Sequence, residues 1–335
     1  MKKQISTLVI ALLCSIVTSY AQLAEVEKFQ KNLSNSNIDT VAWMHSGTLN
    51  IGCNQGFLHN WAAGGELGSI TISGLFNGNL TRYNHKHIWS NNLDLSYGLF
   101  YAYSNSFVPR KLDDRIDFTS KYGYKIKPNK DFYFTALANF KTQFNQGFDY
   151  AATNWSNRPT SNFLSPGYVT LALGFEYRKG SQITLFLSPL AARMTLASSD
   201  FTKLLPTGAF GIEYGKTSRT ELGAYFSGRY VKELSKNVVY RTRVDFYTNY
   251  LAKNTVGENG LIIKKDNPGN IDWLWDNLLT FKASKLINVS LATTLIYDND
   301  IPYAPANDAA TEPGSGLGWW QMKQIFTIGF QYKFK

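Results

Sequence analysis

Charged residues recur at every second position in several segments of this sequence. In Arg115-Ile116-Asp117-Phe118 and in Arg241-Thr242-Arg243-Val244-Asp245, charged side chains alternate with neutral ones. In an extended strand, this alternation puts the charges on one face. The charged faces of the predicted strands contain Arg115, Asp117, Lys121, Lys141, Glu176, Glu221, Arg229, Arg241, Arg243, Asp245, Asp276, Lys282 and Lys323.

These charged faces allow two functional interpretations. In the first, they line a charged channel or a binding site for a polar solute. In the second, they form an ion-pair network that fills a narrow interior, because an Arg or Lys that faces lipid at mid-membrane depth costs about 2–4 kcal/mol. Cations and anions are interleaved, so we favour the ion-pair network and keep solute binding open.

Residues for catalysis or metal binding are sparse. The four histidines are His45, His59, His85 and His87. A hydrolase would need a Ser or a pair of carboxylates near a His, and the pair Asp113-Asp114 has only His59 as a candidate neighbour at the same predicted rim. The turn that holds His85 and His87 lacks acidic partners for a metal. We therefore assign no catalytic residue, no metal ligand and no cofactor.

The strands that must carry the charges have an apolar second face, most clearly in Gly318–Lys335. Every second residue from Trp320 to Phe334 is apolar or aromatic except Gln324. Aromatic residues at both ends of this stretch are typical of a membrane-spanning strand with two interfacial girdles. A C-terminal strand with a terminal aromatic also resembles the signal by which outer-membrane barrels are recognised, so we expect the barrel-assembly machinery as a partner during insertion.

Similar alternation recurs along the chain and predicts an all-β fold. The earlier strands are expected near Val41, Ile70, Trp89, Ile116, Phe132, Val169, Ile183, Leu222, Tyr240, Trp273 and Val289. Short and long connections alternate between them, which predicts an antiparallel transmembrane β-barrel of about 12 strands with both termini in the periplasm. Ala209–Tyr214 is also strand-like. We place it in an outer loop, because another spanning strand would make the number odd.

The N-terminus predicts export. Lys2 and Lys3 precede an apolar run from Ile5 to Val17, and Ser19-Tyr20-Ala21 provides a cleavage site, which is the pattern of a signal peptide over residues 1–21. Residues 22–40 are expected to be a flexible periplasmic segment, and residues 41–335 the barrel. After cleavage, Cys53 would be the one remaining cysteine, which excludes an intramolecular disulfide.

Composition narrows the function classes. The formal net charge is +10, from 34 Lys and Arg against 24 Asp and Glu, but the charges are spread singly along strands, so no nucleic-acid partner is expected. Mean hydropathy is −0.23, and beyond the predicted signal peptide no apolar run reaches the length of a membrane helix. An aromatic content of 15% favours strands.

Several short strings resemble a known family. They are NWAAGG at Asn60–Gly65, Arg110-Lys111 followed by Asp114, KYGYK at Lys121–Lys125, SNFLSPGY at Ser161–Tyr168, GAFGIEYGK at Gly208–Lys216 and YDNDI at Tyr297–Ile301. Together they resemble an outer-membrane β-barrel family of Gram-negative bacteria that is catalogued as a domain of unknown function. The resemblance implies the fold, and it brings no substrate, cofactor or catalytic residue.

These observations predict a non-enzymatic protein of the cell outer membrane, a narrow or gated barrel that transports or binds a polar solute. One alternative is a structural or interaction component of an envelope complex, with envelope proteins and outer-membrane lipid as partners. A second alternative is an outer-membrane hydrolase that acts on lipid or peptide.

Overall fold

The structure of the chain is a computed structural model. It describes residues 42–57, 67–127, 131–150, 155–157, 159–180, 182–204, 208–256, 262–264, 266–284, 287–298 and 320–334. The predicted signal peptide and the segment that follows it lie outside these residues. No helix within the described ranges is long and apolar enough to cross a bilayer.

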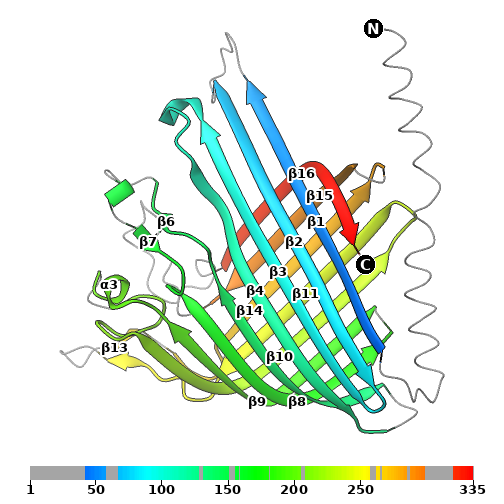
Figure 1. The fold of residues 1–335 in the computed structure, drawn as a ribbon. Helices are drawn as coiled ribbons and strands as arrows, with labels where there is room; N and C mark the ends of the chain where they lie inside the picture. The colour runs from blue at the N-terminus through cyan, green and yellow to red at the C-terminus, as the bar shows by residue number, and fades with distance from the viewer. Residues whose placement is uncertain are drawn as a thin grey trace, which may run out of the picture.

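The strands close into a single antiparallel barrel (Figure 1). Around the barrel, the order is β1-β16-β15-β14-β11-β10-β9-β8-β5-β4-β3-β2, and β1 pairs with β16 to close the ring. The strands are β1 (Ala42–Phe57), β2 (Gly68–Asn84), β3 (His87–Ala102), β4 (Arg110–Lys125), β5 (Phe132–Thr142), β8 (Gly167–Lys179), β9 (Ile183–Leu196), β10 (Ser218–Glu233), β11 (Val238–Asn249), β14 (Ile271–Lys282), β15 (Ile287–Tyr297) and β16 (Trp320–Phe334). The predicted all-β, 12-strand antiparallel barrel is confirmed.

Short and long connections alternate around the ring. The short ones are 85–86, 126–131, 180–182, 234–237 and 283–286, and the long ones are 58–67, 103–109, 143–166, 197–217, 250–270 and 298–319. Small elements occupy the long connections, namely η1 (Tyr103–Asn105), β6 (Gly147–Phe148), η2 (Trp155–Asn157), β7 (Pro159–Ser161), α3 (Ser199–Thr202), β12 (Thr255–Val256) and β13 (Ile262–Lys264). In Figure 1, β6, β7, α3 and β13 lie together on the left.

The strand-like segment Ala209–Tyr214 belongs to the connection between β9 and β10. It forms the isolated bridge between Ala209 and Ile212 and is not a strand of the barrel. Its predicted place in a long loop is therefore correct.

The two faces of the barrel wall differ in polarity, as expected from the alternation of apolar and polar residues along each strand. Outward side chains such as Leu171, Phe175 and Leu187 are 55%, 53% and 57% exposed. Inward side chains are mostly polar, and many of them are buried, including Thr135 and Glu176. One small apolar cluster lies inside, formed by Leu137, Ala172, Phe186, Ala191, Tyr225 and Tyr247. The interior is therefore held largely by polar contacts.

A β-bulge in β9 changes which residues of that strand face inward. Between the pairs Phe175↔Leu187 and Leu173↔Leu190, β9 contains one more residue than β8. Ser188 and Pro189 of β9 lie between these pairs, and proline, which has no N–H to donate to a ladder, is tolerated at bulges. Beyond the bulge the alternation is shifted by one residue, so Arg193 lies on the inner face.

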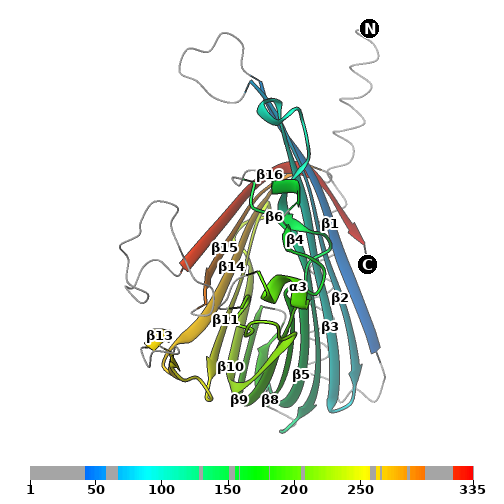
Figure 2. The same ribbon diagram turned by 90° about the vertical axis from the view of Figure 1, so that its left-hand side faces the viewer.

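The closing seam between β1 and β16 is shorter than the other pairings of the ring. Six residues of β1, Gly47 to Gly52, pair with β16, whereas β1 pairs with β2 over its full length. In Figure 2, β16 diverges from β1 away from this paired region. Past the last pair, the Asn54 amide still donates to the Phe326 carbonyl oxygen at 3.1 Å. The strands approach so closely at the last pair that a Cβ at Gly329 would collide with the carbonyl oxygen of Ile51.

Engineered disulfides test where this seam ends. With Cys53 replaced by Ser, Leu49→Cys with Tyr332→Cys should cross-link readily, because these residues are directly opposed and opposed residues of antiparallel strands lie within disulfide reach. The control is Phe57→Cys with Gln324→Cys, which would be opposed if the same register continued. Gel mobility should show a cross-link in the first pair alone, and equal cross-linking would mean that the seam is paired along its length.

Candidate functional site

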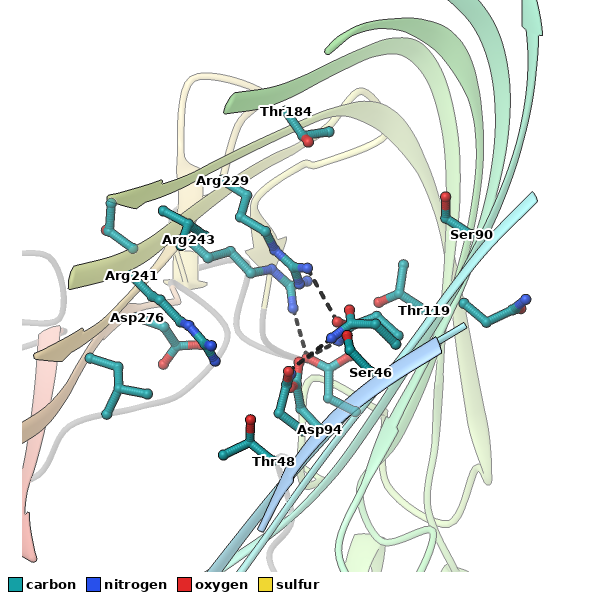
Figure 3. A pocket seen from close by; sticks show the side chains of 18 of the residues that line it. Ser46, Thr48, Ser90, Asp94, Thr119, Thr184, Arg229, Arg241, Arg243 and Asp276 are labelled. Atoms are coloured by element: carbon teal, nitrogen blue, oxygen red, sulfur yellow. Dashed lines mark hydrogen bonds and ion pairs between the residues drawn. The ribbon is translucent and has the colours of Figure 1, made fainter. Parts of the chain in front are cut away.

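A polar cavity of about 520 Å³ lies inside the barrel. Side chains of β1, β2 and β3 form one wall, including Ser46, Thr48 and Asn92. Arginines of β10 and β11 extend toward this wall from the opposite side (Figure 3). The cavity therefore has a wall of mostly neutral polar groups, with the carboxylate of Asp94 among them, opposite a cationic one.

One buried ion-pair cluster joins β4, β5 and β11. Arg243 of β11 contacts Asp117 of β4 at 3.0 Å and Asp245 of its own strand at 2.7 Å. Lys141 of β5 lies 3.9 Å from Asp117 and 3.6 Å from Asp245. The Asn139 amide donates to Asp117 at 2.6 Å. Both carboxylates thus have cationic and neutral donors.

A second cluster surrounds Glu176 of β8, which is fully buried. Its carboxylate pairs with Lys121 of β4 at 3.0 Å and with Arg178 two residues further along β8. Arg178 also donates to the Ser90 hydroxyl of β3 at 3.1 Å. This cluster links three strands through one anion and two cations.

A third cluster lies near the ends of the strands that lead into long connections. Arg193 contacts Glu221 of β10 at 2.8 Å and Asp272 of β14 at 2.6 Å. Arg219 also contacts Glu221, at 2.8 Å. The Arg193 guanidinium lies 4.0 Å from the centroid of the Tyr247 ring, a favourable cation–π distance.

Two further ion pairs connect walls that are far apart around the ring. Arg115 of β4 contacts Asp276 of β14 at 3.2 Å, and these strands are six positions apart in the twelve-strand order. Lys323 of β16 contacts Asp113 of β4 at 2.6 Å. Direct side-chain contacts therefore span the interior and narrow it.

The predicted charged residues fall into two groups. Most take part in the ion pairs described above, and Lys282 lies 3.7 Å from Glu233. Arg229 donates instead to the Asn92 side-chain oxygen at 3.2 Å. Arg241 lines the cavity, and we find no hydrogen bond or ion pair for it among the described residues.

Several charged residues of the interior were missed in the sequence. Asp94 alternates with Leu93 and Leu95, so the phase of β3 could have revealed it. Arg178 lies two residues after Glu176 and was lost at the strand end. Arg193 follows the β9 bulge, which hides its face. Asp113 follows a register shift between β3 and β4 and was placed at the rim.

The residues considered for hydrolysis have other partners. Asp113 binds Lys323. Asp114 binds Lys111 and accepts from the backbone N–H of Phe144 at 2.7 Å. His85 bonds to Asn84 and His87 to Tyr122, and His59 lies outside the described residues. Within those residues, no three His, Cys, Asp or Glu side chains are grouped as metal ligands.

Comparison with known proteins was made by family and by structure. The model of a family described as "Protein of unknown function (DUF3078)" matches residues 53–148. This match confirms the resemblance to a domain of unknown function over that part of the chain. No curated protein matches the sequence.

Comparison with solved structures finds outer-membrane proteins of low identity and low TM-score. The translocator domain of autotransporter NalP from Neisseria meningitidis is 9% identical, with 94% of this chain and 95% of that chain covered and a TM-score of 0.32. The COG4313 outer membrane channel from Pseudomonas putida F1 is 10% identical, with coverage of 88% and 96% and a TM-score of 0.34. OccK5 (OpdH) from Pseudomonas aeruginosa is 8% identical, with coverage of 89% and 99% and a TM-score of 0.28. TM-scores this low do not identify a function.

Glu176 offers a direct test of the buried network. Glu176→Gln leaves Lys121 and Arg178 buried without their counter-charge, and loss of one partner of a buried pair typically costs about 3–5 kcal/mol. The free energy of unfolding in micelles should therefore fall by about 3–5 kcal/mol. It can be measured by heat-modifiable gel migration at increasing urea concentration.

The matched control is Glu213→Gln in the connection before β10. Glu213 pairs with Lys216 at 2.6 Å with both side chains exposed, and the hydrogen bond from Lys216 lowers the pKa of Glu213. An exposed pair contributes up to about 1 kcal/mol, so this variant should unfold nearly as the wild type does. Equal losses in the two variants would contradict a structural role for the Glu176 cluster.

Proposed function

We propose that the chain is a non-enzymatic outer-membrane barrel whose interior is constricted at rest and binds a small polar solute. The observation that carries this proposal is the interior itself. Charged side chains from opposite walls meet there, and they leave a polar cavity of about 520 Å³ beside the contacts.

The outer surface supports a place in the membrane. The exposed apolar side chains of the strands point outward, as contact with lipid requires. Aromatic pairs lie near both ends of the strands. Trp43 with Trp89, at 6.2 Å between ring centroids, is near the short turns, and Trp273 with Tyr297, at 6.3 Å, is near the long connections. Such pairs are typical of interfacial girdles.

The orientation that we propose places the short turns and both termini in the periplasm, because barrels of this class have short periplasmic turns. With Cys53 replaced by Ser, Ser106→Cys in the long connection 103–109 should react with a membrane-impermeant maleimide on intact cells. Lys236→Cys in the short turn 234–237 should react only after the outer membrane is opened. The reverse pattern would invert the orientation.

Planar-bilayer recording tests the constricted interior. The wild type should give little or no steady current, since ion pairs such as Arg243–Asp117 bridge the lumen. Arg243→Gln removes the cation shared by Asp117 and Asp245, so this variant should be less stable and should show current bursts.

Lys232→Gln is the control for the loss of one positive charge. Lys232 is an exposed residue of β10, the strand that pairs with the strand of Arg243. This variant should behave like the wild type. Large, steady wild-type currents would contradict the constricted interior and favour an open channel.

The purified wild-type protein also separates the two alternatives. Turnover of lipid or peptide would favour the hydrolase. An envelope protein that co-purifies in stoichiometric amount would favour a structural component.

A further inference from the structure

Two arginines of the cavity have no carboxylate partner in the described part of the chain. Arg229 donates to the neutral Asn92, and Arg241 has no hydrogen bond or ion pair to the described residues. The other lumen arginines, namely Arg115, Arg178, Arg193, Arg219 and Arg243, each contact at least one carboxylate. Arg229 and Arg241 are therefore exceptions inside an otherwise paired interior.

These two arginines are also close in the sheet. Val231 of β10 is opposite Arg241 of β11, so Arg229 is the inward-facing residue diagonal to Arg241. Two cations on neighbouring strands repel each other, and the repulsion is larger in a partly desolvated interior than in water. A bound anion would offset it.

The surroundings suit one anionic group and not several. Two carboxylates lie nearby in the lining. Asp94 accepts hydrogen bonds from the side-chain amides of Asn77 and Asn92, and Asp276 is paired with Arg115. Their charges would oppose a second anion in the same space. Elsewhere the wall presents neutral groups, including Ser46, Thr48 and Asn79, which can exchange hydrogen bonds with hydroxyl groups of a solute.

We propose that the cavity binds a small hydroxylated solute through one oxyanion group, which lies between Arg229 and Arg241. Guanidinium groups match the geometry of carboxylate and phosphate oxygens and bind them with two parallel hydrogen bonds. A cavity of about 520 Å³ is within the usual range for small-molecule sites. This inference rests on the proposed function, since it names the class of solute for the same lumen.

Binding is tested with the full-length protein in detergent micelles and inorganic phosphate as the probe. Calorimetric titration at constant ionic strength, with chloride as the reference anion, should show saturable phosphate binding by the wild type. Arg241→Gln should weaken it roughly tenfold or more, because a charge-assisted bidentate contact is lost. Arg241→Lys should retain part of the affinity.

The matched control is Lys232→Gln, which removes an exposed cation of β10 that does not line the cavity. It should leave phosphate binding unchanged. The inference is overturned if the wild type does not bind phosphate more strongly than chloride, or if Lys232→Gln and Arg241→Gln weaken binding equally. Because this titration needs no membrane, it stands apart from the bilayer recordings. Phosphate binding by a barrel with large steady currents would overturn the constricted interior alone, and a constricted barrel without phosphate binding would overturn this inference alone.

Discussion

The contact between Arg243 and Asp117 is the constraint on which the rest of the interior depends. These residues come from β11 and β4, five positions apart around the ring, and their charged groups meet at 3.0 Å. Asp245 and Lys141 are joined to the same contact. A buried charge is stable only when it is paired and hydrogen-bonded, so the walls of the barrel must stay close enough for these groups to meet.

This constraint explains why the two faces of each strand differ in polarity. The outward face is apolar, and it has no opposite layer to pack against within the protein. The inward face carries the charges, and their pairing replaces the apolar core of a water-soluble domain. The interior is not filled evenly. Lys141, Glu176 and Arg193 all take part in ion pairs. Arg229 and Arg241 instead face a cavity. We infer that the cavity is the part of the lumen that remains available to a ligand.

The sequence allowed the architecture to be predicted but not the partners of the charged residues. Alternation identifies strands because it depends only on the period of the backbone, and loop lengths then give the topology, as the placement of Ala209–Tyr214 illustrates. Arg193 was missed because a bulge at Pro189 reverses the phase. The contact of Arg115 with Asp276 could not be predicted, since it depends on strand order, register and the width of the closed ring. The shortened seam of β1 with β16 left no signal in either strand.

The most direct test of this account is a double-mutant cycle on the unfolding free energy with Asp117→Asn and Arg243→Gln. If these groups join the opposite walls, the two losses will not add, and their coupling will be in the range of about 0.5–3 kcal/mol found for residues in contact. Losses that add to within about 0.5 kcal/mol would show that the two groups act independently, and they would contradict a lumen held together by ion pairs across it.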